Sequence, residues 1–388
     1  MKANVFTDAS FGADAGRFVW LGVNTERAVT ASFQKRFPFP AWPTFFVIDP
    51  RDEHVALRWI GGMSVPQTHA LLDEGTASYD RPLASLSDLD RTLQLADSLY
   101  AVGDNLASAT AYQAALAQAP DTWPPYRRTL ESALFALSST DSAEATMRLV
   151  QQGMPHVMGT LSEANFASTG LSTALGLPKD HPHRAAWITQ YEAQTTALAT
   201  HPPAGSSGDD IAGLYSTLVD ARDDAGDSLG VHATLHRWAG FMESAIKSAV
   251  SPEARSVFDG NLVEVFHRLG TPEKAVPYLL ANERDLPADY NPPARLGLAY
   301  LYMKRYDNAL AANDRAMAKV YGPRKLRVYT IRTDIEMAMG NPPAAVRTMT
   351  DAVAFAQSLP EGQRRAGTIA AMQKRLAELQ TGPPGAAH

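Results

Sequence analysis

Two pairs of histidines come closest to a metal-binding pattern. His232 and His236 lie four residues apart in a segment with helical periodicity, which would place both rings on one face of a helix. A zinc peptidase would need a glutamate directly after the first histidine, and Ala233 stands there. His181 and His183 flank a proline in a loop, and no third ligand is evident for them. We interpret all four as packing or solvated histidines, so the sequence predicts no metal site.

Motifs for nucleophiles and phosphates give no better support for catalysis. Ser244 and Lys247 have the Ser-x-x-Lys spacing of penicillin-interacting enzymes, but the companion Lys-Thr-Gly is missing and the segment is helical. There is no glycine-rich phosphate loop, Gly-x-Ser-x-Gly turn or His-Glu-x-x-His motif. Asp49 is interpreted as a turn residue. Since cysteine is absent, thiol catalysis, disulfides and cysteine-bound metal are excluded within these residues. We predict no catalytic residue and no cofactor.

The composition is that of a globular protein with ample apolar residues. The 388 residues are 45% hydrophobic and 20% charged, which is enough for two or three domains. The formal net charge of −6 offers no basic surface for nucleic acid. The sequence has no apolar run of the length that a membrane span needs. We therefore look for the elements that would position a binding site for another protein.

Residues 1–75 alternate strand-like and helix-like segments. Apolar runs at 17–24 and 43–49 and an alternating run at 54–60 predict strands, the last two joined by a hairpin turn. The spacing of apolar residues predicts helices at 26–37 and 64–75, the second with Ser64 as N-cap and Gly75 just past its end. Pro43 is unusual, because a proline cannot donate a hydrogen bond in a sheet and belongs at a strand's first residue.

This order of elements resembles the thioredoxin fold over about a fifth of the chain. The stretches "FPFPAWPTFFVIDP" and "WIGG" resemble that family's cis-proline segment and the glycine before its last helix. "MKANVFTD" resembles the helix that follows the Cys-x-x-Cys motif. The resemblance implies that Pro43 is preceded by a cis peptide bond and that Trp42, Pro43 and Thr44 contact substrate.

The resemblance also implies a missing central strand between 17–23 and 43–48. We expect that the natural chain starts upstream of Met1, with the alternative that the segment is a redox-dead remnant. In the first case the two strands run parallel with an open slot between them, and in the second they pair directly. Either way, the sequence without cysteine should lack thiol-disulfide activity.

After a polar connection at 76–87, residues 88–380 show helical periodicity with an internal repeat. Ala275 and Ala309 are 34 residues apart, and Ala345 follows 36 residues later. This period and the residues in frame with it resemble the tetratricopeptide repeat. Hairpins are expected at 255–287, 290–319 and 325–356. The residues expected to pack the repeats are Ala275, Leu296, Gly297, Tyr300, Ala309, Ala316 and Ala345, and Tyr306 is also expected to pack.

The remaining helices are expected to continue the repeat array. An early unit within 93–120 has Ser108 where the repeat usually has alanine, and Asn313 replaces an aromatic residue in a later one. Helices are expected near 126–153, 184–199, 211–225 and 231–249, and a last helix at 362–380 caps the stack. Residues 381–388 are expected to form a disordered tail.

Two functions are consistent with this reading. The fold is predicted to be an α/β thioredoxin-like part followed by an all-α solenoid of tetratricopeptide type. The first hypothesis is a thiol-disulfide oxidoreductase in a longer form, with a helical arm that binds a protein or peptide partner. The alternative is a non-catalytic adaptor. The resemblance favours a periplasmic location, with the cytoplasm as the alternative, and the sequence predicts no oligomeric state.

Overall fold

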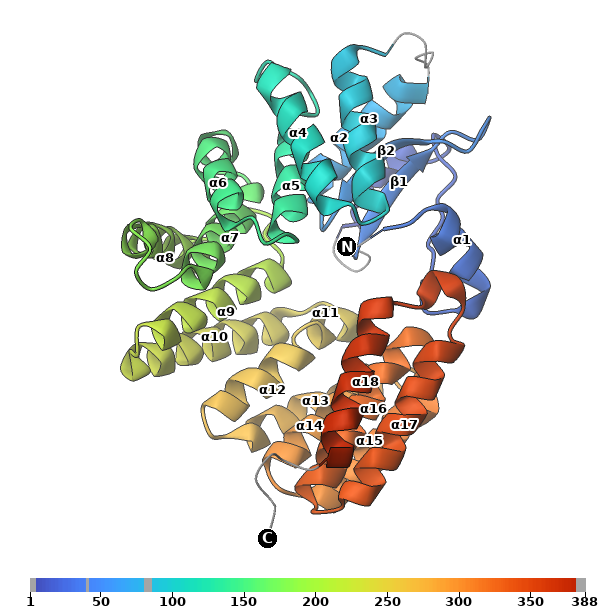
Figure 1. The fold of residues 1–388 in the computed structure, drawn as a ribbon, viewed down its shortest axis with the longest axis vertical. Helices are drawn as coiled ribbons and strands as arrows, with labels where there is room; N and C mark the ends of the chain where they lie inside the picture. The colour runs from blue at the N-terminus through green and yellow to red at the C-terminus, as the bar shows by residue number, and fades with distance from the viewer. Residues whose placement is uncertain (1–4, 40–41, 80–85, 382–388) are drawn as a thin grey trace. The chain divides into compact units, whose positions relative to one another are not determined.

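The computed structural model describes residues 5–39, 42–79 and 86–381, and it is mostly helical (Figure 1). The chain forms two compact units. Unit 1 contains Met1–Phe18 and Pro38–Thr234, and unit 2 contains Val19–Phe37 and Leu235–His388. The chain therefore passes between the units at three points. Among the described residues, no helix combines the length and the apolar character needed to cross a membrane.

A two-stranded sheet is the core of the N-terminal part of unit 1. Strands β1 (Thr44–Ile48) and β2 (Val55–Ile60) pair antiparallel, with Thr44 opposite Ile60 and Phe46 opposite Arg58. Leu57, Trp59 and Met63 pack with Leu71 of helix α2 (Val65–Tyr79). The Trp42–Pro43 peptide bond is cis, as the sequence predicted. Both predicted strands of the hairpin are confirmed.

The strand expected at 17–24 is wrong. Residues 19–24 are irregular, and Val19 is 89% exposed. The physical reason is that a strand needs a hydrogen-bonding partner, while this segment belongs to unit 2 and β1 belongs to unit 1. Without that strand the expected parallel crossover is not formed, and in the part of the chain that the structure describes β1 pairs with β2 and not with 17–24. The sheet of the described residues has two strands, which is not a thioredoxin-like sheet.

Two helix boundaries in this region also differ from expectation. The helix expected at 26–37 is a 3₁₀ turn, η2 (Ala28–Thr30), followed by the short helix α1 (Ala31–Arg36). Ser64 caps α2 as expected, since its Oγ accepts a hydrogen bond from the Gln67 N–H. Gly75 does not end α2, which continues into the expected connection as far as Tyr79. Gly75 is instead buried where a Cβ would lie 3.1 Å from a methyl carbon of Val47, so it lets the helix approach the sheet.

The rest of unit 1 is a series of helical hairpins (Figure 1). Successive helices from α3 to α9 pack against each other, and their buried residues form one continuous core. The helices are α3 (Asp88–Ala101), α4 (Asn105–Gln118), α5 (Tyr126–Ser138), α6 (Ala143–Val157), α7 (Ser162–Gly176), α8 (Arg184–Thr200), α9 (Gly208–Asp224) and the start of α10 (Ser228–Ser248). Helix α7 was not anticipated from the sequence. Ser108 departs from the repeat for a physical reason, because its buried hydroxyl donates to the Ala96 carbonyl.

Unit 2 continues with shorter helices that stack as hairpins. They are α11 (Pro252–Ser256), α12 (Asp259–Arg268), η4 (Pro272–Ala275) with α13 (Val276–Asp285), α14 (Asn291–Tyr302), α15 (Tyr306–Lys319), η5 (Gly322–Arg324), α16 (Lys325–Ala338), α17 (Pro342–Ser358), η6 (Glu361–Gln363) and α18 (Ala366–Thr381). The all-helical array expected over this region is confirmed. Of the tail expected at 381–388, Thr381 is the last residue of α18, and residues 382–388 lie outside the described residues.

Small residues bring the two helices of each hairpin in unit 2 together. Ala275, Ala309 and Ala345 are all 0% exposed. On α14, a Cβ at Gly297 would lie 3.5 Å from the Ala309 carbonyl oxygen, so that pair is in van der Waals contact. Asn313 is buried and its side-chain amide donates to the Val328 carbonyl of the next hairpin, which explains why a polar residue stands there.

Candidate functional site

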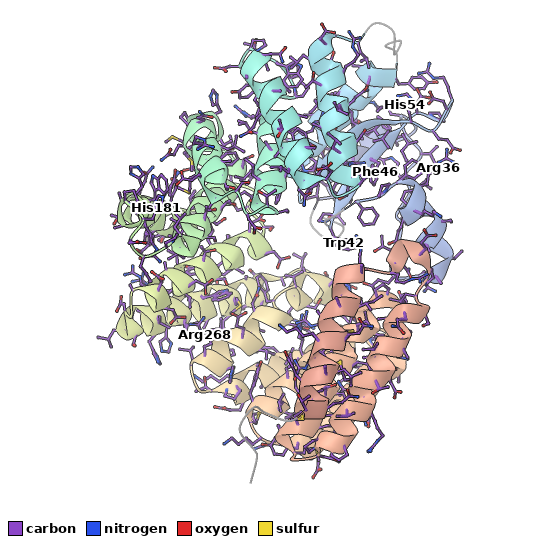
Figure 2. The ribbon with its side chains drawn as sticks, viewed as in Figure 1. Arg36, Trp42, Phe46, His54, His181 and Arg268 are labelled. Atoms are coloured by element: carbon purple, nitrogen blue, oxygen red, sulfur yellow. The ribbon has the colours of Figure 1, made fainter. Side chains whose placement is uncertain are left out.

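Trp42, Pro43 and Thr44 stand where β1 begins. Trp42 is 54% exposed and meets the ring of Phe39 edge-on, with centroids 5.5 Å apart (Figure 2). The Pro43 carbonyl accepts a hydrogen bond from the Gly61 N–H, which closes the open end of the hairpin. Thr44 is half-buried and pairs with Ile60. The segment therefore has a local structural role, and Trp42 keeps an exposed ring.

Asp49, Asp52 and His54 form the one group of side chains, among those described, with metal-ligand geometry. Asp49 is already paired, because the Arg51 guanidinium binds both of its oxygens. That hydrogen bonding lowers the pKa of Asp49 to about 2. Asp52 in turn contacts the His54 ring at 2.5 Å. The cluster closes the turn between β1 and β2, in agreement with Asp49 as a turn residue, and it carries no metal proposal.

The four histidines of the sequence patterns lie in ordinary surface environments. His181 is labelled in Figure 2, and its Nε2 atom is 2.7 Å from Glu144 Oε1. The His181 and His183 rings both pack near Trp187. His232 and His236 are exposed on α10. Ser244 and Lys247 lie within the same helix.

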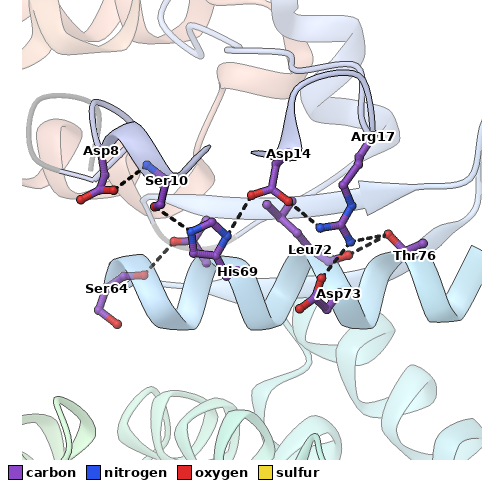
Figure 3. A network of polar contacts seen from close by, with 10 residues as sticks. Asp8, Ser10, Asp14, Arg17, Ser64, His69, Leu72, Asp73 and Thr76 are labelled. Carbon is purple, nitrogen blue, oxygen red and sulfur yellow. Dashed lines mark hydrogen bonds and ion pairs between the residues drawn. The ribbon is translucent and has the colours of Figure 1, made fainter. Parts of the chain in front are cut away.

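A serine, a histidine and an aspartate that sequence reasoning missed meet where the 3₁₀ helix η1 (Ala9–Asp14) packs on α2 (Figure 3). The Ser10 Oγ atom is 2.9 Å from His69 Nε2. The other ring nitrogen, His69 Nδ1, is 2.8 Å from Asp14 Oδ2. Asp14 is buried and also pairs with Arg17. This is the order of groups found in nucleophile–base–acid relays.

The remaining geometry assigns this trio a structural role. The Ser10 N–H, which would have to stabilise an oxyanion, donates to Asp8 Oδ1 at 2.9 Å. The ring of His69 is covered by Phe11, whose centroid lies 4.5 Å away in a stacked arrangement. Asp14 Oδ2 makes no hydrogen bond. Its short contact with the His69 ring therefore lacks the alignment that a relay needs. The network ties η1 to α2.

A buried charged cluster fixes the sheet of unit 1 to the helices that follow it. Arg128 of α5 lies 3.2 Å from Asp97 of α3 and donates to the Arg58 carbonyl of β2. Asp97 also accepts a hydrogen bond from the Tyr112 hydroxyl on α4. Arg58 donates to the Asp97 carbonyl and covers the ring of Phe46 at 5.0 Å. Four elements therefore converge on Asp97, through its carboxylate and its main-chain carbonyl, and these contacts hold the hairpin against the helices.

In unit 2, the first helices of successive hairpins lie side by side and present exposed polar and aromatic side chains. His267 of α12 stacks on Tyr302 of α14, with ring centroids 3.6 Å apart. A Cβ at Gly260 of α12 would lie 3.3 Å from the Arg295 guanidinium of α14. We call the surface carried by α12, α14 and α16 the first-helix face. Its residues are Glu264, His267, Arg295, Tyr302 and Arg327.

Arg295 is the electrostatic centre of this first-helix face. Burial and the neighbouring Arg327 lower the pKa of Arg295 to about 10. Burial also raises the pKa of the nearby Asp259 to about 7, and one oxygen of that carboxyl has no hydrogen-bond partner. No carboxylate among the described residues lies within ion-pair distance of Arg295. The face thus holds a part-buried cation that is not neutralised directly.

Comparison with known proteins gives a limited result. No family model matches the chain, and no curated protein matches it in sequence. A tetratricopeptide repeat protein from Parabacteroides merdae is 11% identical, with a TM-score of 0.45, over 76% of this chain and 99% of that chain. A tetratricopeptide repeat protein from Thermus thermophilus is 15% identical, with a TM-score of 0.26, over 76% and 100%. Both scores are below 0.5, and the evidence for the repeat architecture is the buried alanines and hairpin contacts of this chain.

Proposed function

We propose that the chain is a helical-repeat scaffold that binds a partner protein or peptide on the first-helix face of unit 2. The observation that carries this proposal is Arg295. A part-buried cation is costly unless an anion compensates it. Asp259, the neighbouring carboxyl, has a pKa raised to about 7 and so compensates it poorly at neutral pH. A carboxylate from a partner would supply the missing charge.

The surroundings of Arg295 suit a polypeptide better than a small molecule. Tyr302 and His267 offer an exposed aromatic pair, and Glu264 and Arg327 add charges of both signs. Aromatic and arginine side chains are enriched at protein interfaces. The face also runs over three successive first helices, a surface of the kind that helical repeats use for extended partners.

The test is a selection of partner peptides on the full chain. Random peptides displayed on phage would be selected on the wild-type protein, and the enriched sequences synthesised and titrated. We expect them to carry an acidic side chain or a free carboxyl terminus. Since a hydrogen bond to a charged group contributes about 1.5–3 kcal/mol, Arg295→Gln should weaken binding at least about tenfold.

The matched control is Arg305→Gln, because Arg305 is an exposed arginine of the same unit at the start of α15. It should leave the affinity unchanged. Selected peptides that bind Arg295→Gln as tightly as the wild type would show that the first-helix face is not the binding surface.

A further inference from the structure

Residues 24–36 dock on unit 2 in the manner of a bound peptide. They precede almost the whole of unit 1 in the sequence, yet their contacts are with residues around η5 and η6, near the other end of the chain. The Lys35 ammonium lies 2.9 Å from a Glu361 carboxylate oxygen. Helix α1 packs against η6. Unit 2 therefore already holds one short segment that is connected to it only through unit 1.

Recognition of the backbone comes from Gln363. This side chain is buried, and its Nε2 donates to the Thr25 carbonyl at 2.8 Å and to the Arg27 carbonyl at 3.0 Å. Such bonds recognise the shape of the turn at 25–27 and not its side chains. The Oε1 atom of Gln363 is buried without a hydrogen-bond partner. The resident segment thus leaves one acceptor of the site unused.

Recognition of side chains comes from η5 and the residue before it. Glu26 pairs with Arg324 at 2.8 Å, and the Asn24 side-chain amide donates to the Tyr321 hydroxyl at 2.8 Å. The Arg27 guanidinium lies over the Tyr321 ring, 5.0 Å from its centroid. The surface therefore recognises an acidic side chain, Glu26, with a polar residue, Asn24, before it and a basic residue, Arg27, after it.

Two glycines make room for the backbone of the segment. A Cβ at Gly322 would lie 2.0 Å from the Glu26 carbonyl oxygen, and one at Gly362 would lie 2.4 Å from the Ala31 carbonyl oxygen. Any other residue at these positions would push the segment away. Unit 2 is thus shaped for this backbone at two points.

The turn holds its own conformation. Asn24 Oδ1 accepts a hydrogen bond from the Glu26 N–H, and the Thr30 hydroxyl donates to the Asn24 carbonyl. These local bonds need no other part of the protein. A free peptide with the same sequence can therefore adopt the shape that unit 2 recognises.

We propose that the surface formed by Tyr321, Gly322, Arg324, Glu361, Gly362 and Gln363 is a second peptide-binding site, which residues 24–36 of the same chain occupy, and that it also accepts a free segment with an acidic side chain on an Asn-capped turn. This deepens the proposed function, because it names the chemistry of one partner. The site adjoins the first-helix face, since η5 leads directly into α16.

The test uses a fluorescein-labelled peptide of residues 22–36 and the full chain. In the wild type the chain's own segment competes, so binding should be weak. The double variant Asn24→Ala/Glu26→Ala should release that segment and bind the wild-type peptide at least tenfold more tightly. Adding Arg324→Glu to this opened variant should remove the gain, and a peptide carrying Glu26→Arg should restore it. Adding Arg305→Glu instead is the control and should change nothing.

A second measurement keeps the proposal testable where the opened variant folds poorly. The chain has no cysteine, so Lys35→Cys/Glu361→Cys can be bridged cleanly by a short bismaleimide. We expect a cross-link within one chain. Equal peptide binding by wild type and opened variant, indifference to Arg324→Glu, or a cross-link only between two chains would each overturn the proposal. Acidic peptides selected through Arg295 would still bind, so this failure is distinct from failure of the proposed function.

Discussion

Single small residues decide several of the close contacts in this protein, because a glycine or an alanine lets a neighbouring segment approach its backbone. The periodic alanines of the repeats were predicted because a spacing of 34 to 36 residues recurs along the chain. Gly75 was misread as a helix end, since a glycine that admits a methyl group from a strand looks the same in sequence as one that ends a helix. Gln363 and Arg295 gave no signal at all. Their partners lie far away along the chain or in a neighbouring repeat, and no local pattern records such distances.

Replacing Gly362 should loosen the docked segment. In Gly362→Ala the new methyl group would lie 2.4 Å from the Ala31 carbonyl oxygen, so α1 must move away. We expect faster tryptic cleavage after Lys35 and Arg36, by about tenfold or more, corresponding to a loss of about 1.4 kcal/mol of local stability. Gly367→Ala is the control, because a Cβ there meets nothing within 4 Å. Equal cleavage of both variants would contradict the close approach.

Asp259 should give unit 2 a pH-dependent stability. Burial raises its pKa from 3.8 to about 7, so between about pH 4 and 7 the folded chain binds more protons than the unfolded chain. The free energy of unfolding therefore falls as the pH rises through this window, by at most about 4 kcal/mol. Asp259→Asn should remove this pH dependence of stability, because an amide does not ionise. The amide oxygen can still accept the hydrogen bond from Asn282.

The measurement is urea unfolding of wild type and Asp259→Asn at several pH values. The variant should gain stability relative to the wild type as the pH rises from 4 to 7. Asp351→Asn, at an exposed position on α17, is the control and should follow the wild type. A constant difference between Asp259→Asn and wild type across this range would show that Asp259 is ionised normally.

At the scale of elements, long periodic helices were predicted well and isolated apolar runs were not. The hairpins of unit 2 follow from a spacing that repeats, so each unit supports the assignment of the next. The run at 17–24 has no such support. Its apolar residues fit a strand, but a strand forms only where a partner is available, and the segment joins the other unit. Helix α7 was missed because its apolar residues repeat no earlier pattern.

Overpacking the α14–α15 interface should destabilise the stack. Ala309 is fully buried against α14, so Ala309→Trp has no space for the ring. Overpacking commonly costs about 1–3 kcal/mol even for smaller insertions. We expect Ala309→Trp to lower the melting temperature of unit 2 markedly, as measured by circular dichroism. Ala311→Trp, at an exposed position of the same helix, should melt like the wild type. The interface would not be tightly packed if the two variants behaved alike.

At the scale of the whole molecule, the order of segments along the chain differs from their grouping in space. Val19–Phe37 belongs to unit 2, although unit 1 supplies the residues on both sides of it. No local property of the sequence could reveal this, because the contacts join residues about three hundred positions apart, such as Glu26 and Arg324. The sequence therefore predicted the helical array, but it grouped residues 19–37 with the sheet of unit 1 and not with unit 2.

The last prediction tests this grouping directly. Replacing residues 24–36 by a glycine–serine segment of equal length removes the Asn24 side chain that holds the turn. The two carbonyls that Gln363 binds are then no longer presented together, and the exposed Glu26–Arg324 pair is lost. Each hydrogen bond contributes about 0.5–1.5 kcal/mol and the exposed pair less than about 1 kcal/mol. Unit 2 should thus lose about 2 kcal/mol. Hydrogen exchange should quicken in α16, α17 and α18 and stay unchanged in α5–α8 of unit 1, which serve as the internal reference. Faster exchange in α5–α8 with α16–α18 unaffected would mean that the segment belongs with unit 1, as the sequence alone suggested.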